Sequence, residues 1–321
     1  VSAWLDEGDR EFGGYDSLVL WHAYPRIGVD QRNQFDFYRD MPGGLRGLRE
    51  TIDAVHRRGV RVFIDYNPWD TGTRREGRSD LDVLVELVQA LDADGIFLDT
   101  MDKGAVEFRA KLDAARPGVI LESEGVPPIE RLADHHASWA QHFRDSAAPG
   151  VLRYNWFERR HLQHQIWRWK HDHSAEVHTA WMNGSGIMVW ENVFGSWVPW
   201  CARDRSILRL MLPVQRRFAQ VFIEGEWIPL VPVLQPGVYA SLWENQQIRL
   251  WTLVNRTTET IRANLLALNV RKGDLLFDLT TGREMPAKQA GEHAVSSSDS
   301  GPRVCIAHGT LPPRGIGCFL A

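Results

Sequence analysis

The sequence predicts an α/β fold, a (β/α)8 barrel of the TIM type followed by a small antiparallel β-sandwich domain. Over the first two thirds of the chain, short apolar runs alternate with amphipathic segments of helical period, which is typical of parallel strands joined by helices. From residue 222 on, the runs alternate or are rich in β-branched side chains, which indicates antiparallel strands. We therefore expect two domains, the barrel over 1–221 and the β domain over 222–321.

The expected barrel strands are short and apolar, and they cover Ser17–Ala23, Val60–Tyr66, Gly95–Asp99, Gly118–Glu122, Gly150–Tyr154 and Gly186–Trp190. The helices are expected over Leu45–Arg58, Asp80–Leu91, Lys103–Ala115, Arg159–Lys170 and Arg203–Phe218. Ser79 is the expected N-cap of the second helix. A closed barrel needs two further strands, one lost with an incomplete N-terminus and one near Gln220–Ile223.

The expected strands of the β domain cover Val238–Trp243, Ile248–Asn255, Thr260–Leu265 and Asp274–Asp278. An open doubly wound sheet is the alternative for the first domain. It is disfavoured because no GxGxxG turn follows the first strand and no GxxxxGK[ST] loop occurs in the sequence.

Composition excludes several classes of function. Hydrophobic residues make up 44% and charged residues 24% of the 321 residues, as in a folded globular chain. A net charge of −4 favours neither nucleic acid nor an anionic membrane, and no apolar run approaches the ~20 residues that span a bilayer. Three cysteines without a CxxC pair exclude a disulfide framework and disfavour a thiolate metal site. We expect no cofactor.

The chain begins at Val1 without a basic segment and an apolar core, so its N-terminus is interpreted as processed or truncated. Both a secreted or periplasmic and a cytoplasmic location stay open, and partner proteins stay unassigned. Tryptophan is frequent, at 14 residues against 6 tyrosines. This number indicates either heavy core packing or a ligand with flat apolar faces, such as a sugar.

Ionisable side chains follow four expected strands. Because function in a parallel barrel sits at the carboxyl ends of the strands, these residues are the candidate site. They are Asp65, Asn67, Trp69 and Asp70 after the second strand, Asp99 and Asp102 after the third, Glu122 and Glu124 after the fourth, and Trp190 and Glu191 after the last. Trp21 and His22 follow the first strand.

Paired carboxylates at one edge fit cleavage of a glycosidic bond, in which one protonates the leaving oxygen and the other attacks carbon or activates water. Structural roles stay open beside this one. Asp99 could cap the next helix, Asp65 could bind loop amides, and Glu191 could pair with Arg205. His135, His136, His171 and His173 lie in polar stretches without an HExxH motif, and we expect them on a solvated surface.

At these residues the chain resembles glycoside hydrolases with (β/α)8 catalytic domains, of the broad α-amylase and melibiase type. The similar segments are PGGLRGLRETIDAVHRRGVRVFIDYNPWD, ADGIFLDTMD and GVILESEG. The resemblance implies that Asp99 is the nucleophile and that Glu122 or Glu124 is the acid/base. Phe97 stands where amylase-type enzymes carry Arg, and melibiase-type enzymes would take the acid from the region Tyr154–Glu158.

The expected function is therefore a retaining glycosidase, in which Asp99 attacks and Glu124 or Glu122 protonates the leaving oxygen. The other candidates named above would bind the carbohydrate. Two alternatives remain: a non-catalytic carbohydrate-binding protein on the same fold, and a metal-dependent barrel enzyme holding a divalent ion among Asp65, Asp99, Glu122 and Glu191.

Overall fold

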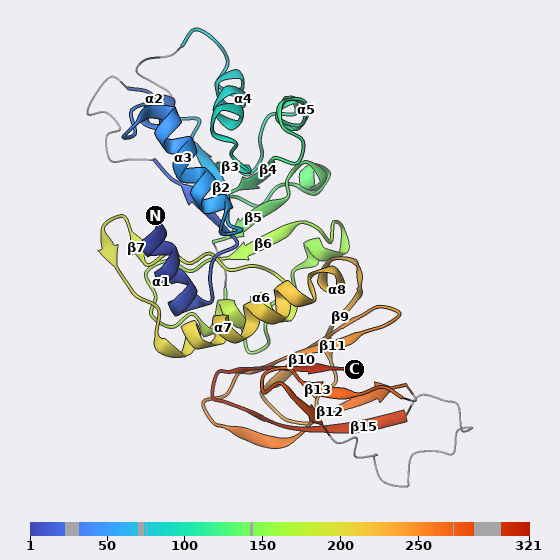
Figure 1. Ribbon diagram of the computed structural model, residues 1–321. Helices are drawn as coiled ribbons and strands as arrows, with labels where there is room; N and C mark the ends of the chain where they lie inside the picture. The colour runs from blue at the N-terminus through green and yellow to red at the C-terminus, as the bar shows by residue number, and fades with distance from the viewer. Residues whose placement is uncertain (23–31, 70–73, 75, 142–143, 272, 286–302) are drawn as a thin grey trace. The chain divides into compact units, whose positions relative to one another are not determined.

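The computed structural model describes residues 1–22, 32–69, 74, 76–141, 144–271, 273–285 and 303–321 (Figure 1). Two compact units are present. The first comprises Val1–Gln141 and Trp156–His164, and the second comprises His142–Asn155 and Gln165–Ala321. The domain boundary expected at residue 222 stays a prediction.

The first unit is built on a six-stranded sheet whose strands follow one another in chain order. They are β1 (Ser17–Leu20), β2 (Arg61–Tyr66), β3 (Gly95–Leu98), β4 (Ile120–Ser123), β5 (Ala137–Ala140) and β6 (Leu162–Gln165). Strands β1 to β5 pair parallel. This sequential parallel order confirms the predicted α/β class and is the order of strands in a barrel wall.

Helices pack on one face of this sheet. They are α1 (Ser2–Phe12), α2 (Gln34–Arg39), α3 (Gly44–His56), α4 (Asp80–Leu91) and α5 (Glu107–Ala115). The buried core joins Ile64, Ile96 and Leu121 of the strands to Ile52 of α3 and Leu84 of α4. Figure 1 shows α3, α4 and α5 beside β2 to β4. Since side chains alternate along a strand, the positions between these apolar residues face away from the helices.

Two helix starts show how the sequence sets local structure. The Ser79 hydroxyl accepts a hydrogen bond from Asp82 N at 3.2 Å, which confirms Ser79 as the N-cap of α4. Helix α2 was not expected. Its N-cap Asn33 forms a capping box with Asp36, because the Asn33 side chain accepts from Asp36 N while the Asp36 carboxylate accepts from Asn33 N.

The second unit contains three helices and the antiparallel strands. The helices are α6 (Ser174–Asn183), α7 (Ala202–Arg217) and α8 (Ala219–Glu224), and β7 (Asn192–Val193) and β8 (Ser196–Trp197) form a short hairpin. One antiparallel sheet has the order β14-β13-β16-β11-β10-β9 and another pairs β12 with β15. Helix α6 packs on the larger sheet, and Trp181 donates its indole N–H to Gly317 O.

The antiparallel strands confirm the change of pattern after residue 222. They are β9 (Glu226–Val231), β10 (Val238–Glu244), β11 (Arg249–Asn255), β12 (Ile261–Val270), β13 (Leu276–Asp278), β14 (Arg283–Met285), β15 (Arg303–Leu311) and β16 (Ile316–Leu320). Alternate residues of both sheets share one core, in which Trp251 and Leu253 of β11 lie with Leu266 and Leu268 of β12 and Phe319 of β16.

Three expected elements are wrong. The segment Gly150–Tyr154 forms no strand and leads into a 3-10 turn, η2 (Arg153–Trp156). The helix expected over Arg159–Lys170 is replaced by β6, since a short run with few apolar residues fits both periods. Gln220–Ile223 lies in helix α8. The strand expected over Gly186–Trp190 is reduced to one parallel bridge, between Ile187 and Gln165.

Candidate active site

The register of the parallel sheet aligns the acidic positions of neighbouring strands. Asp65 on β2 lies opposite Phe97 on β3, and Phe97 lies opposite Glu122 on β4. Because side chains two positions apart share a face, Asp99 and Glu124 continue this row towards the carboxyl ends of their strands. This face is the one that the helices do not cover. The structure thus brings Asp65, Asp99, Glu122 and Glu124 to one side of one sheet edge.

Asp99 follows directly on β3 and is only 3% exposed. Its Oδ2 accepts a hydrogen bond from Asn67 Nδ2 at 2.8 Å, and its own N–H donates to Tyr66 O. Asp99 does not cap the following helix, since the N-cap of α5 is Val106. A charge-assisted hydrogen bond to a buried carboxylate favours its ionised form and fixes its orientation.

Asp65 and His22 form a second buried pair, with His22 Nε2 3.8 Å from Asp65 Oδ2. The imidazole lies against the rings of Phe37 and Tyr38. Burial lowers the pKa of His22 to about 4, so the ring is neutral at pH 7 and the contact is polar rather than ionic. The Tyr38 hydroxyl accepts from Asp65 N at 2.7 Å. Burial, followed by the Asp65 charge, raises the pKa of Tyr38, which keeps that hydroxyl protonated.

Glu122 is held by two side chains from the next strands. Its Oε1 accepts from the Trp139 indole N–H at 2.9 Å and lies 2.5 Å from His164 Nδ1. The Trp139 ring stacks on Phe97 at 4.2 Å between centroids. Burial lowers the pKa of His164, but the Glu122 carboxylate raises it by more, so the net pKa of His164 is raised. Glu122 is thus anchored to an imidazole and to a rigid aromatic pair.

Glu124 is half-buried, and its Oε2 accepts the backbone N–H of Thr100 at 2.7 Å. Thr100 has φ 61°, in the left-handed region that side chains with a branched Cβ rarely adopt. Its strained peptide therefore joins the residue that follows Asp99 to the second carboxylate. Gly125 N donates to Met101 O, which ties the two loops together a second time.

Other expected site residues lie around this edge. Asn67 is buried, and its Oδ1 accepts from Trp69 N at 3.1 Å, while the Trp69 side chain is 51% exposed. Trp21 is half-buried after β1, and Asp102 is exposed in the loop after β3. Asp70 lies outside the described residues.

Trp190 and Glu191 belong to the second unit. Glu191 Oε1 accepts from Arg205 Nη2 and from Trp200 N, both at 2.8 Å, so the arginine pairing considered from the sequence is present. Trp190 lies under the Arg168 guanidinium, 4.6 Å from the ring centroid. A role for either residue in substrate binding stays a prediction.

The histidines do not all lie on a solvated surface. His135 and His173 are buried, which contradicts the prediction, while His136 and His171 are exposed. The polar sequence around these residues did not indicate burial, because the hydrogen-bonding atoms of each buried ring are satisfied by other groups of the protein. His135 Nε2 accepts from Gly104 N at 3.1 Å, and His173 Nδ1 contacts Glu176 Oε1 at 2.7 Å while its ring stacks on Trp200.

In the described part of the chain, one group of side chains could bring three metal ligands together: Asp53, His56 and Asp92. Arg49 pairs with both carboxylates of this group, so a protein cation already lies between them. Among the helices that the structure describes, none is long and apolar enough to cross a membrane.

Sequence reasoning missed five residues that hold the candidate site. Thr100, Trp139 and His164 contact its carboxylates. Gln34 and Tyr38 bind the backbone of Asn67 and Asp65. Trp139 and His164 lie on β5 and β6, which the sequence did not predict. Thr100 adjoins Asp99, but nothing in the sequence indicates its left-handed conformation. Gln34 comes from a short helix that only its capping residues could have signalled.

No protein-family model matches the sequence, and no curated protein matches it either. Solved structures do match. An α-amylase from Geobacillus thermoleovorans complexed with acarbose aligns at TM-score 0.63 and 14% identity, over 99% of this chain and 90% of that one. An Anoxybacillus α-amylase aligns at TM-score 0.65 and 13% identity, over 99% and 89%. A Nostoc punctiforme debranching enzyme aligns at TM-score 0.58 and 14% identity, over 98% and 87%. The expected resemblance to α-amylase-type enzymes is confirmed at the level of the fold.

Proposed function

We propose that this chain is a glycoside hydrolase that cleaves an O-glycosidic bond in a carbohydrate. One observation carries the proposal: acidic side chains from three adjacent parallel strands share the sheet face that the helices leave open, at the carboxyl edge. Glycosidic cleavage requires such a pair of carboxylates. The likeness in fold to amylases and a debranching enzyme supports the same chemistry.

Asp99 is the proposed nucleophile and attacks the anomeric carbon. Its hydrogen bond from Asn67 stabilises the charged form that attack requires. Glu124 is the proposed acid/base, because it is half-buried and so can meet both the leaving oxygen and water. Glu122 is fully buried against His164 and Trp139, and we assign it a supporting charge at the floor of the site. This retaining scheme requires a separation of about 5–5.5 Å between the two reacting carboxyl groups.

Asp65 and the neutral His22 are proposed to bind sugar hydroxyls. The indole rings of Trp21 and Trp69 are proposed to stack on sugar rings. Asn67 and Asp102 complete the proposed binding set in this unit, and binding roles for Asp70, Trp190 and Glu191 stay predictions from the sequence. We further propose that the six-stranded sheet belongs to a (β/α)8 barrel and that the two antiparallel sheets form a sandwich. No cofactor takes part in this scheme.

The test is sugar release from a panel of α- and β-aryl glycosides, starch and other polysaccharides. Wild type is compared with Asp99→Asn, Glu124→Gln and Glu122→Gln, and with Asp113→Asn as an exposed control on α5. Asp99→Asn is expected to lose activity on every substrate. Glu124→Gln is expected to lose about 10²–10⁴-fold on poor leaving groups but little on dinitrophenyl glycosides, which need no proton.

Equal losses for Glu124→Gln on both leaving groups would refute its role as the acid. If Glu122→Gln showed the leaving-group dependence instead, Glu122 would take that role. Full activity of Asp99→Asn, or no release by wild type from any member of the panel, would count against the proposed function.

A further inference from the structure

A buried glutamine pairs with the end of strand β2. Gln34 Nε2 donates to Asn67 O at 2.7 Å, and Asn67 N donates to Gln34 Oε1 at 2.9 Å. Both residues are fully buried. Strand β2 ends at Tyr66, so the Asn67 peptide has left the sheet ladder. The Gln34 side chain takes the place of a neighbouring strand there and satisfies both groups.

The Asn67 side chain links this backbone pairing to Asp99. Its Oδ1 accepts from Trp69 N at 3.1 Å, and its Nδ2 donates to Asp99 Oδ2 at 2.8 Å. The amide can only satisfy both partners in this orientation, because a flipped group would set its oxygen against the carboxylate and its NH₂ against a backbone N–H. The position of the Asn67 backbone therefore sets the direction of the donor on Asp99.

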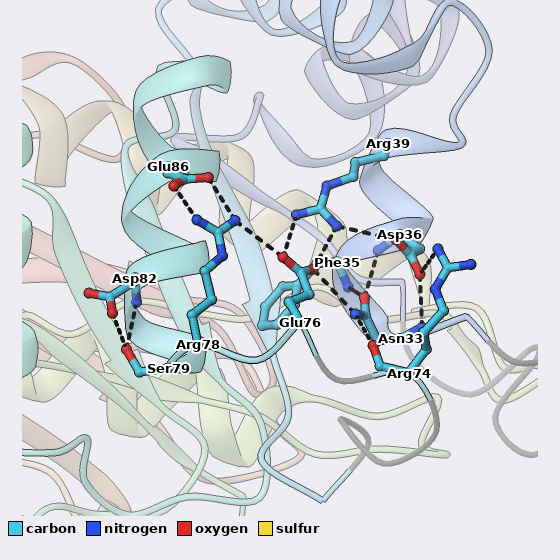
Figure 2. Close-up of polar contacts among 10 residues, drawn as sticks. All are labelled: Asn33, Phe35, Asp36, Arg39, Arg74, Glu76, Arg78, Ser79, Asp82 and Glu86. Carbon is cyan, nitrogen blue, oxygen red and sulfur yellow. Dashed lines mark hydrogen bonds and ion pairs between the residues drawn. The ribbon is translucent and has the colours of Figure 1, made fainter.

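The start of helix α2 holds Gln34 in turn, and Figure 2 shows the contacts of its cap residue, Asn33. Gln34 is the first residue of this helix, and Asn33 is its cap. Asn33 Nδ2 donates to Arg74 O at 2.8 Å and to Glu76 Oε1 at 3.2 Å. Hydrogen bonding, from Arg39 first of all, lowers the pKa of Glu76 to about 2, so this carboxylate is charged at neutral pH. Asn33 and Glu76 thus tie the helix start to the chain that follows β2.

From these contacts we propose that Gln34 is a positioning residue for the reaction and acts on Asp99 through Asn67. The proposal rests on the proposed role of Asp99 as nucleophile. Without Gln34 the Asn67 peptide loses its two partners, and the donor that favours the Asp99 carboxylate is no longer held in place. Asp99 would then take up its proton at a higher pH, and its rotation about Cβ–Cγ would be freer.

The experiment compares wild type with Gln34→Leu, Asn67→Leu and the double variant. Gln34→Glu serves as a second variant that keeps the size and the oxygen facing Asn67 N. Gln89→Leu is the control, because it makes the same change at an exposed glutamine of α4 that does not contact Asn67. Activity is measured on the best substrate of the panel as kcat and KM against pH. The Asp99 carboxyl carbon is titrated by ¹³C NMR and assigned through Asp99→Asn.

Asn67→Leu is expected to lower kcat about 10- to 100-fold, the loss of one hydrogen bond to a charged group. Gln34→Leu is expected to lower kcat about tenfold while KM changes less than about twofold. The kcat of Gln34→Glu is expected to lie between those of Gln34→Leu and wild type. In Asn67→Leu and Gln34→Leu the acid limb of the pH profile and the Asp99 titration move to higher pH. The double variant should be no worse than Asn67→Leu, because the two act in series. Gln89→Leu should leave the Asp99 titration unchanged.

An Asp99 titration that is the same in wild type, Gln34→Leu and Gln34→Glu would overturn the proposal, as would losses that add in the double variant. A shift of the same size in Gln89→Leu would also overturn it, because the effect would then not depend on contact with Asn67. The NMR readout needs no turnover, so it tests this chain of contacts even if wild type hydrolyses nothing. An inactive wild type with a shifted titration would refute the proposed function and keep the positioning role.

Discussion

At the scale of single residues, three carboxylates of the candidate site are each held by a neighbour on another strand or loop. Asn67 holds Asp99, His164 and Trp139 hold Glu122, and the Thr100 peptide holds Glu124. Thr100 does so in the left-handed region, which costs a non-glycine residue about 1–2 kcal/mol. Strain of this kind beside a candidate nucleophile is the pattern expected where a backbone is shaped for chemistry.

Thr100→Gly should relieve that strain. The free energy of unfolding is expected to be unchanged or to rise by up to about 1 kcal/mol, because the gain in the folded state is partly offset by the larger entropy of glycine in the unfolded chain. Thr100→Val is the matched control, which keeps the shape and the strain. Chemical denaturation measures both. A glycine variant less stable than the valine variant would show that Thr100 is not strained.

At the scale of elements, the sequence correctly predicted the strands and helices whose residues follow a regular pattern of burial. Strand β3 is a run of four buried residues, β2 is buried after its first residue, and α4 starts at a serine cap, so their patterns are unambiguous. Strand β6 carries Gln163 and His164 and satisfies them through tertiary contacts, which no local pattern reveals. For the same reason the acidic half of the candidate site could be predicted and its donors could not.

Helix α6 was also missed, and its first turn carries a buried acid. Glu176 contacts His173 at 2.7 Å. Burial raises the pKa of Glu176 to about 7 from its ordinary 4.5, helped by Asp204 and opposed by His173. A carboxyl whose pKa is raised by folding stabilises the fold below its unfolded pKa, and this stabilisation is lost as the pH rises through the folded value.

Relative to Glu176→Gln, the wild-type free energy of unfolding should therefore fall as the pH rises from 4.5 to about 7. Each unit of pKa shift contributes about 1.4 kcal/mol, which makes the fall a few kcal/mol. Denaturation of both proteins across this range measures it. Glu107→Gln, at an exposed acid in the first turn of α5, is the control. A constant difference between wild type and Glu176→Gln would contradict the raised pKa.

At the scale of the whole molecule, helices cover one face of the parallel sheet and the acidic row occupies the other. The fold resembles α-amylases at 13–14% identity, so the arrangement of strands persists where sequence likeness has nearly vanished. The oxygens of the row accept from protein donors: an amide on Asp99, an indole and an imidazole on Glu122, and a peptide N–H on Glu124.

Each of these three carboxylates thus already shares one oxygen with a protein donor, which weakens it as a ligand for a divalent cation. Dialysis against a chelator is therefore expected to leave both the activity and the melting temperature unchanged. The measurement compares treated protein with treated protein to which Mg²⁺, Ca²⁺ or Zn²⁺ is returned. Activity that disappears with the chelator and returns with one ion would instead favour a metal-dependent barrel enzyme.

The presence of Phe97 in β3 has a consequence for the pH dependence of the candidate site. By the resemblance to amylase-type enzymes an arginine is expected at this position, and the basic side chain beside Glu122 is His164 instead. Arginine keeps its charge at every pH in which proteins work, whereas histidine gives up its proton in mild alkali. The net charge around the carboxylates Asp65, Asp99, Glu122 and Glu124 therefore depends on the pH. Engineering this chain for alkaline conditions would begin at Phe97 and His164 and leave the carboxylates as they are.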